Sequence, residues 1–438
     1  MNMPEVVITG FGSVNPLGLT AEQMWDGICQ GKCGIKTVSA FDASKFKCRL
    51  AGEVTEFSIR DYVPKSHRKA TKLMSRDIEL SVIAAKEAVQ SAGLVTKDAE
   101  SGEMNIEPLM TAINFGAGLI SADLDELAAA VGTSITDGKF DMHKWGASGM
   151  NALTPLWLLK YLPNMLACHI GIIHDMQGPS NTITCGEVSS HIAIIEASQV
   201  IQRGQAQLAL AGGGEAKVNP VVLMRQSLLG RATFSSNDNP QGACRPFDSK
   251  AGGSVFGEAA GVIVLEDADR AKKRNAKIFA VIAGTGQSNS LSPVFHHLEP
   301  SGKAIKIAIE KALKEANISP ADIDLIVPHG TGIPCDDAAE AKGIQDALGE
   351  AVKNIAVLPI KSMVSNVGAA SGSLDIIAAV CAMRDSVIPA AKNFDSPIAG
   401  CKLNINTKKI EKKIRYALCT GYTFGGQTAA VVLKNFNG

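Results

Sequence analysis

The sequence has no excess of charge of either sign, and this absence excludes one class of partner. Lys and Arg together number 43, and Asp and Glu together also number 43, so the formal net charge of the 438 residues is zero. A balanced chain has no overall positive field to attract a polyanion and no acidic tail. We therefore expect no nucleic-acid partner.

The sequence also lacks the features of a secreted or membrane-spanning protein. Its start, MNMPEVVITGFG, enters a β-rich run directly, without a basic segment followed by an apolar stretch. No uninterrupted apolar run reaches the roughly 18 residues that a spanning helix needs. We expect a soluble, cytoplasmic protein without a membrane span.

Patterns for metal and nucleotide binding are missing as well. The ten cysteines are spread along the chain without a CxxC pair, and such pairs are the usual sign of a disulfide framework or a zinc site. Neither GxGxxG nor GxxxxGK[ST] occurs between a strand and a helix. The sequence thus predicts no metal site and no bound cofactor.

What the sequence does contain is typical of an α/β protein. Aromatic residues make up only 5%, whereas hydrophobic residues reach 46% and glycines number 42, as expected for closely packed helices and glycine-dependent turns. Strand and helix patterns follow one another in a similar order in residues 1–267 and 268–438. We expect two similar halves, in five layers if two sheets pack around shared central helices.

The period of the apolar residues predicts the individual elements. The expected strands are residues 5–12, 110–115, 182–184, 207–211, 278–283, 325–328, 414–420 and 428–434, with another ending at Asp267. The expected helices are residues 20–29, 65–94, 123–131, 153–161, 188–202, 219–229, 302–316, 338–348 and 372–384. Residues from about 95 to 170 are less regular, which favours a cap or a dimer surface inserted in the first half.

The clearest unit is the strand, turn, helix and strand of residues 178–215. Its turn is Cys185-Gly186-Glu187, at the mouth of a nearly buried helix. Unpaired N–H groups and the positive end of the helix dipole stabilise an anion there, and Glu187 occupies this place. Cys185 is a second candidate nucleophile, although buried cysteines at strand ends are commonly inert.

Three other loops lie where α/β folds place reactive groups. They begin at His329 (HGTGIPCDDAAEA), Lys361 (KSMVSNVGAASGS) and Gly421 (GYTFGGQT). His329 is the best candidate for a general base among the eight histidines, although a lone histidine after a strand is more often structural. Phe424 is either a movable aromatic gate or part of a tight turn.

As an ordered set, these motifs are specific. The motifs are GPSNTIT, AGGGE, CRPFD followed by GEAAG, PHGTGIPCDDAAEA, KSMVSNVGAASG and FGG. Over nearly its whole length the chain resembles the β-ketoacyl-acyl carrier protein synthases of the thiolase superfamily, nearest to the type II enzymes. The resemblance implies a thiolase-like αβαβα fold, a role in fatty acid or polyketide biosynthesis, and a homodimer or a heterodimer with an active ketoacyl synthase.

The resemblance also implies a reaction and its residues. Family members transfer an acyl chain to a cysteine and condense it with malonyl-acyl carrier protein, with the help of two histidines; the substrate arrives on phosphopantetheine. Aligned without a gap, Glu187 replaces the cysteine and Asn366 the second histidine, while His329 matches the first histidine and Lys361 the family lysine. A carboxylate cannot hold a thioester, so we do not expect condensation by the family's route.

Chain-length factors of the same family also lack the thiol, and we expect a similar partner subunit that shapes an acyl tunnel. Two alternatives stay open. One is a divergent decarboxylase or acyltransferase that uses Glu187, His329 and Asn366, although an ionised Glu187 would repel a malonyl carboxylate. The other is a non-catalytic scaffold.

Two further sets of residues complete the expected site. We expect Thr331, Phe424 and Gly425 to bind substrate. A basic cluster that includes Lys65, Arg68 and Lys69 is either a solvated face or a patch for an anionic partner. The resemblance favours docking of the acidic acyl carrier protein at this cluster.

Overall fold

The large sheet of the computed structural model contains the same strand arrangement twice. The model describes residues 4–99 and 102–436, and ten strands hydrogen-bond in the order β12-β11-β15-β16-β10-β1-β9-β8-β4-β7. Numbered along the chain within each set of five, both sets run 3-2-4-5-1 from the outer edge inward. In both, the second strand is parallel to its neighbours and the fifth is antiparallel.

The ten strands divide evenly between the two sets. The first set is β1 (Val6–Val14), β4 (Thr111–Ala117), β7 (Ser180–Ile183), β8 (Leu208–Ala216) and β9 (Glu258–Asp267). The second set is β10 (Ala280–Asn289), β11 (Leu325–Val327), β12 (Ala356–Val357), β15 (Tyr416–Tyr422) and β16 (Gln427–Asn435). Three small two-stranded sheets lie apart from the large one, namely β2 (Ile35–Thr37) with β3 (Leu50–Gly52), β5 (Ile135–Thr136) with β6 (Lys139–Phe140), and β13 (Val387–Ile388) with β14 (Ile410–Glu411).

The two sets meet at a short seam. β1 and β10 pair antiparallel only through Val7 with Val281 and Ile8 with Ala280. Each set therefore behaves as its own twisted sheet, and the packing of side chains, rather than the backbone ladder, holds the two together.

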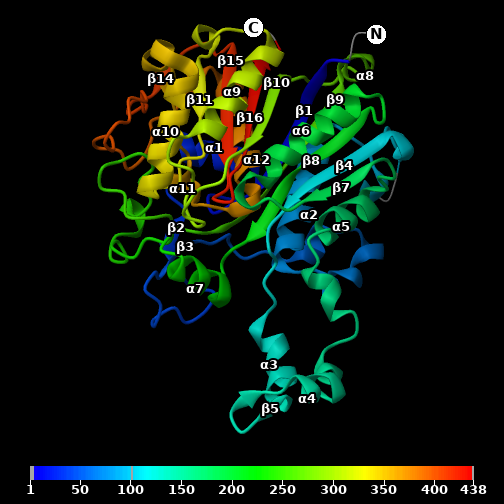
Figure 1. Ribbon diagram of the computed structural model, residues 1–438. Coiled ribbons are helices and arrows are strands. Elements are labelled where there is room, and N and C mark those ends of the chain that lie inside the picture. Colours follow the sequence, from blue (N-terminus) through cyan, green and yellow to red (C-terminus); the bar gives the residue numbers. More distant parts are fainter. Residues whose placement is uncertain (1–3, 100–101, 437–438) are drawn as a thin grey trace.

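Helices fill the space between the sheets and cover both outer faces (Figure 1). The central layer is α1 (Ala21–Cys29), α6 (Ser189–Gln202) and α12 (Ser371–Asp385), whose buried residues join those of both sheets in one core. The outer layers are α2 (Arg76–Ser91) with α5 (Met165–His174), and α9 (Lys303–Ala316) with α10 (Pro334–Leu348). The fold is the expected thiolase-like αβαβα arrangement.

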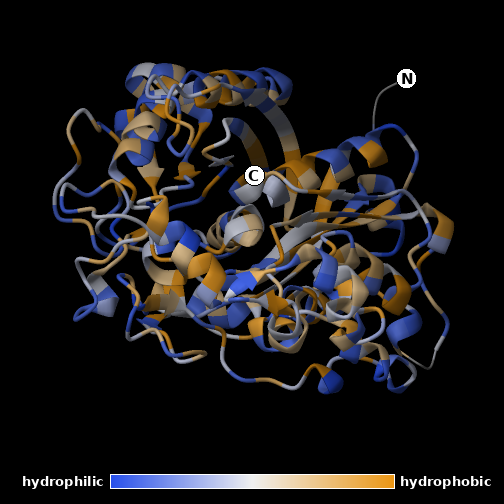
Figure 2. Cartoon of the chain, turned by 60° about the horizontal axis from the view of Figure 1, so that its bottom comes forward, coloured by the Kyte–Doolittle hydropathy of each residue, from blue (hydrophilic) through white to orange (hydrophobic). Residues whose placement is uncertain are grey.

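Whether a helix lies in the central or an outer layer agrees with the distribution of apolar residues in its sequence. Of the 15 residues of α12, 13 are buried, which fits a helix that contacts both sheets. The outer helix α9 instead buries only one side, and Figure 2 shows helices at the surface that carry both hydrophilic and hydrophobic residues. Within residues 4–99 and 102–436, no helix is both long and apolar enough to cross a membrane.

Most of the predicted elements are confirmed, and two helices are wrong at their N-terminal sides. Residues 65–73 form short 3-10 turns, and α2 begins only at Arg76, where buried positions start to recur. In the segment 153–161, Pro155 and the left-handed Leu156 (φ 64°) leave only a 3-10 helix, Trp157–Tyr161. The prediction missed α5, whose sequence is mostly apolar and whose two histidines are also buried, so that no polar stripe marks a helix.

The irregular insert contains an arm that projects from the body of the molecule (Figure 1). It includes α3 (Leu124–Thr133), the β5–β6 hairpin and α4 (Met142–Ala147). Several large apolar side chains on this arm are exposed, namely Leu124, Val131, Ile135, Phe140 and Met142. The remaining helices are α7 (Pro220–Leu228), α8 (Ala268–Lys273) and α11 (Lys361–Val364).

A steric constraint fixes the distance between the central helices. His191 of α6 is fully buried, and within the described chain neither of its ring nitrogens has a hydrogen-bond partner. A Cβ at Gly372 would lie 2.1 Å from its Nδ1, and one at Gly421 would lie 2.4 Å from the same atom. The imidazole therefore needs a glycine on each side.

This constraint predicts the effect of one added methyl group. Gly372→Ala should lower the free energy of unfolding by about 1–3 kcal/mol, because the new Cβ overpacks the centre. Chemical denaturation measures the change, and the loss should shrink in a His191→Ala background. Gly132→Ala is the matched control, because a Cβ at this helical glycine meets open space. Equal losses in both backgrounds would show that the imidazole does not set the spacing.

Candidate active site

Glu187 lies in a short 3-10 helix, Gly186–Val188, directly before α6. Its side chain is only 3% exposed, and its Oε2 accepts a hydrogen bond from Thr423 Oγ1 at 3.0 Å. Gly186 has a φ of 56°, and a Cβ there would lie 2.7 Å from the same Thr423 oxygen. Glycine at position 186 thus permits the left-handed turn and the close approach of Thr423.

Two buried cations keep Glu187 ionised. Burial by itself raises the pKa of this carboxyl group, but the charges of Lys217 and Arg231 and the hydrogen bond from Thr423 outweigh burial and lower the pKa below its usual value. The side chain is a carboxylate at neutral pH. The helix mouth therefore holds a fixed negative charge where the resemblance places a thiol.

Lys217 follows strand β8 and lies in a small charged cluster. Its Nζ contacts Glu215 Oε1 at 2.9 Å, and Glu215 Oε2 accepts a hydrogen bond from Ala369 N at 2.7 Å. Burial opposes the charge of Lys217, but Glu215 and Glu187 overcome this effect and raise the pKa of the amine. A permanent ammonium group consequently faces the carboxylate of Glu187.

Arg231 supplies the second charge and contacts residues of the C-terminal half. It is 1% exposed, and its Nη1 donates to Asp336 Oδ2 at 2.8 Å and to the carbonyl of His296 at 2.9 Å. Its guanidinium carbon lies 4.8 Å from the centre of the Phe424 ring. This cation–π contact holds Phe424 over the arginine.

His329 lies in the loop after β11, two residues beyond the end of the strand, and is 1% exposed. Glu340 fixes its backbone by accepting from His329 N at 2.8 Å and from Gly330 N at 2.7 Å, and the Tyr422 ring packs edge-on at 4.7 Å. Burial, followed by the positive charge of Lys361, lowers the pKa of His329 well below its usual value. The imidazole is neutral at physiological pH, and its Nδ1 has no hydrogen-bond partner among the residues described.

Asn366 and Lys361 are buried next to the central helix α12. Asn366 Oδ1 accepts from Gly368 N at 3.1 Å, whereas its Nδ2 has no partner in the described part of the chain. Lys361 Nζ donates to the Asp375 carboxylate at 3.1 and 3.3 Å. Burial raises the pKa of Asp375 to about 7 although Lys361 opposes the shift. Lys361 is therefore paired and holds the start of α11 against α12.

A cavity of about 460 Å³ reaches Glu187. Its walls include Cys185, Lys217, Phe424 and Gly425, so two of the three residues expected to bind substrate do lie at this cavity. The other expected residues are buried and do not line this cavity, namely His329, Asn366, Lys361 and Thr331. The Thr331 hydroxyl instead donates to Asp337 at 3.0 Å.

The basic residues proposed for docking lie on the surface. Lys65, Arg68 and Lys69 are exposed on the 3-10 turns before α2. Arg76, in contrast, is bound to Glu258 at 2.9 Å and stacks on Phe57. A second cavity, of about 480 Å³, is lined in part by two segments. Residues 74–77 follow the basic 3-10 turns, and residues 218–221 follow Lys217.

Sequence reasoning missed the partners of Glu187. Lys217 could have been found, because it follows the AGGGE motif by two residues and so lies near the end of the same strand. Arg231, Thr423 and Asp336 lie in segments that are far apart in the sequence. Nothing in their spacing indicates that the fold brings them together. Cys185 lines the cavity, and burial raises the pKa of its thiol, which disfavours the reactive thiolate.

Comparisons with known proteins bear on this geometry. Residues 3–271 match the family "Beta-ketoacyl synthase, N-terminal domain" and residues 279–395 match "Beta-ketoacyl synthase, C-terminal domain". The 3-oxoacyl-[acyl-carrier-protein] synthase 2 of Vibrio harveyi is 31% identical over 440 residues, 99% of each chain. That of Staphylococcus aureus strain N315 is 29% identical over 98% of each chain.

Two solved structures extend the comparison. A beta-ketoacyl synthase from Burkholderia phymatum STM815 has a TM-score of 0.85 at 25% identity, over 99% of this chain and 100% of that one. The ishigamide ketosynthase/chain length factor has a TM-score of 0.83, also at 25% identity, with the same coverage.

The buried imidazole predicts a pH dependence of stability. An unfolded histidine takes up a proton below about pH 6.5, whereas the lowered pKa of His329 prevents uptake in the folded state, so stability is lost as the pH falls below 6.5. Between pH 6.5 and 5, the free energy of unfolding should fall by about 2 kcal/mol more in the wild type than in His329→Gln. Urea unfolding at a series of pH values measures both slopes. Parallel slopes would mean that His329 titrates normally when folded.

Proposed function

The chain belongs to the β-ketoacyl synthase family of fatty acid and polyketide biosynthesis, and from this we propose that it is a partner subunit that accommodates an acyl chain without condensing it. It contributes the wall of an acyl tunnel, as a chain-length factor does. The loss of condensation and the retained binding of an acyl chain both depend on the environment of Glu187.

The ionised and anchored carboxylate of Glu187 carries the proposal. A thioester needs a sulfur nucleophile, and an acyl carboxylate anhydride would be far more labile. One oxygen of Glu187 already accepts a hydrogen bond from Thr423, and the charges of Lys217 and Arg231 stabilise the carboxylate. Attack on an acyl thioester would separate this carboxylate from its cations and would give up their stabilisation.

The same charge disfavours malonyl decarboxylation. Two carboxylates about 4 Å apart repel each other by about 4 kcal/mol at an effective dielectric constant of 20. Because the pKa of Glu187 is lowered, this repulsion persists at neutral pH. His329 is neutral but buried, and it does not line this cavity, so it does not reach a substrate there in this conformation.

An open cavity favours a binding role over a scaffold with a filled pocket. The space at Glu187 amounts to about 460 Å³, within the range of small-molecule sites. Phe424 and Gly425 line its mouth, and the aromatic ring rests on Arg231. The acyl chain is proposed to enter at Phe424 and to lie against the apolar residues of this cavity, which include Leu119, Val222 and Leu229.

Two kinds of partner follow from the proposal. Ketosynthase/chain length factor pairs and a ketosynthase bound to an acyl carrier protein are among the similar structures. The projecting arm exposes apolar side chains that include Phe140 and Met142, which a second subunit of the same fold would cover. We propose an active ketosynthase as that subunit, with acyl carrier protein docking at Lys65, Arg68 and Lys69.

Restoring a thiol tests the proposal directly. Glu187→Cys should accept an acyl group from acyl-acyl carrier protein, because Lys217 and Arg231 would lower the pKa of a thiol at this place and favour the thiolate. Intact-mass spectrometry should show the added acyl mass on Glu187→Cys and no adduct on the wild type.

A Cys185→Ser substitution in both proteins serves as the control, because Cys185 lines the same cavity. An adduct on the wild type, or turnover of malonyl- and acyl-acyl carrier protein by the wild type alone, would contradict the loss of condensation. A folded Glu187→Cys protein that stays unmodified would contradict an acyl-binding cavity.

Charge reversal tests the docking surface. Changing Lys65, Arg68 and Lys69 to Glu should weaken binding of acyl carrier protein at least about tenfold at low salt, and added salt should reduce the difference. Isothermal titration calorimetry measures the affinity. The matched control reverses Lys303, Lys311 and Lys314 on the exposed face of α9, which changes the net charge equally. Equal binding by both triple variants would exclude this docking surface.

A further inference from the structure

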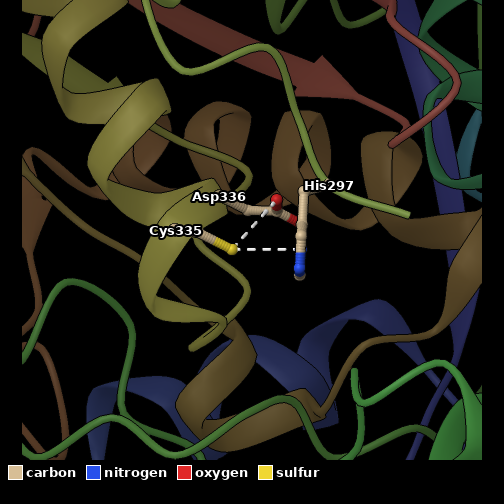
Figure 3. Close-up of side chains that lie close together, drawn as sticks. All are labelled: His297, Cys335 and Asp336. Carbon is tan, nitrogen blue, oxygen red and sulfur yellow. Dashed lines mark hydrogen bonds between the residues drawn. The ribbon is translucent and has the colours of Figure 1, made fainter. Parts of the chain in front are cut away.

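Three side chains with metal-binding atoms converge outside the Glu187 cavity (Figure 3). His297 lies in the segment between β10 and α9, while Cys335 and Asp336 lie in the first turn of α10. The Cys335 sulfur is 3.1 Å from His297 Nδ1 and 3.8 Å from Asp336 Oδ1. All three ligand atoms lie within 4.8 Å of one another.

These separations suit one ion bound by all three atoms. In a tetrahedral zinc site, bond lengths of about 2.0–2.3 Å place neighbouring ligand atoms about 3.5 Å apart. The two sulfur distances lie on either side of this value. The third pair, His297 with Asp336, lies within 4.8 Å, and rotation of the Cys335 and His297 side chains would bring the three atoms closer to this separation.

The donor set indicates which ion would bind. A thiolate, an imidazole and a carboxylate together suit zinc, whereas magnesium and calcium prefer oxygen ligands only. Three protein ligands leave a fourth position, which water fills in zinc sites of this kind. Cys335 is exposed, so an ion can enter from solvent.

Asp336 is already oriented for this role. Its Oδ1, which faces the sulfur, also accepts from Leu298 N at 2.9 Å, and its Oδ2 is held by Arg231 Nη1 at 2.8 Å. Outer hydrogen bonds of this kind fix the orientation of metal ligands. The neighbouring His296 ring stacks 4.2 Å from that of His297, and its buried Nδ1 has no partner among the described residues.

We propose that His297, Cys335 and Asp336 form a zinc site with one position open to water. The ion would tie the segment before α9 to the start of α10. The ion and Arg231 would also share the carboxylate of Asp336. The ion would therefore lie close to the arginine whose charge stabilises Glu187. The proposal is independent of whether the chain condenses acyl groups.

Metal binding by the full chain tests the proposal. Protein stripped with a chelator and then titrated with zinc against a chromophoric chelator should bind one equivalent. Cys335→Ser should bind zinc at least about 100-fold more weakly, since loss even of an outer-shell partner costs about 10–100-fold. With cobalt in place of zinc, the wild type should show a thiolate-to-cobalt absorption band that Cys335→Ser and His297→Ala weaken or lose.

Cys29→Ser is the matched control, because Cys29 is exposed but lies outside the cluster. This variant should keep both the affinity and the band. Failure of the wild type to bind a stoichiometric ion, or equal affinity in Cys335→Ser, would overturn the proposal. Circular dichroism of each variant distinguishes a lost ligand from a lost fold.

Discussion

A carboxylate placed between two sheets has to be neutralised, and the arrangement around Glu187 follows from this requirement. Removing a charge from water costs on the order of several kcal/mol even after relaxation. Lys217 and Arg231 supply the compensating charge, and both are buried and need partners of their own. Glu215 and Asp336 are those partners. The result is a chain of charges from β8 in the first half to α10 in the second, in which Lys217 pairs with Glu215, Arg231 pairs with Asp336, and both cations stabilise Glu187.

This chain explains why the site differs in character from one built around a thiol. A cysteine at the mouth of α6 would face the same two cations as a reactive thiolate. The permanent negative charge of Glu187 balances the two cations, so their positive charge stabilises the structure. Such clusters are destabilised strongly when one member is removed, because the remaining charges stay buried without a partner. The charge of Glu187 is thus coupled to the stability of the whole site.

Periodicity and turn chemistry in the sequence were enough to predict most of the fold. The repeated pattern of strands and helices appears as two sheets with the same strand order, and the all-round apolar stretches became the central helices α6 and α12. Errors occurred where the apolar period was absent, as in residues 65–73, or where a local backbone preference opposed it, as at Leu156.

The sequence is less informative about which distant residues come together in a site. Glu187 was identified from its place before a helix, but Arg231 and the cluster of His297 with Cys335 join residues far apart in the chain, and their spacing carries no periodic signal.

The short seam between β1 and β10 also bears on how the molecule unfolds. In the described part of the chain, β1 and β10 pair through two residue pairs, so the shared layer of α1, α6 and α12 contributes most of the contact between the sheets. If either sheet separated from this helical layer, apolar surface that is now buried would be exposed to water. The two sheets are therefore bound into one cooperative unit, and melting should proceed as a single transition in which the loss of one half removes the support of the other.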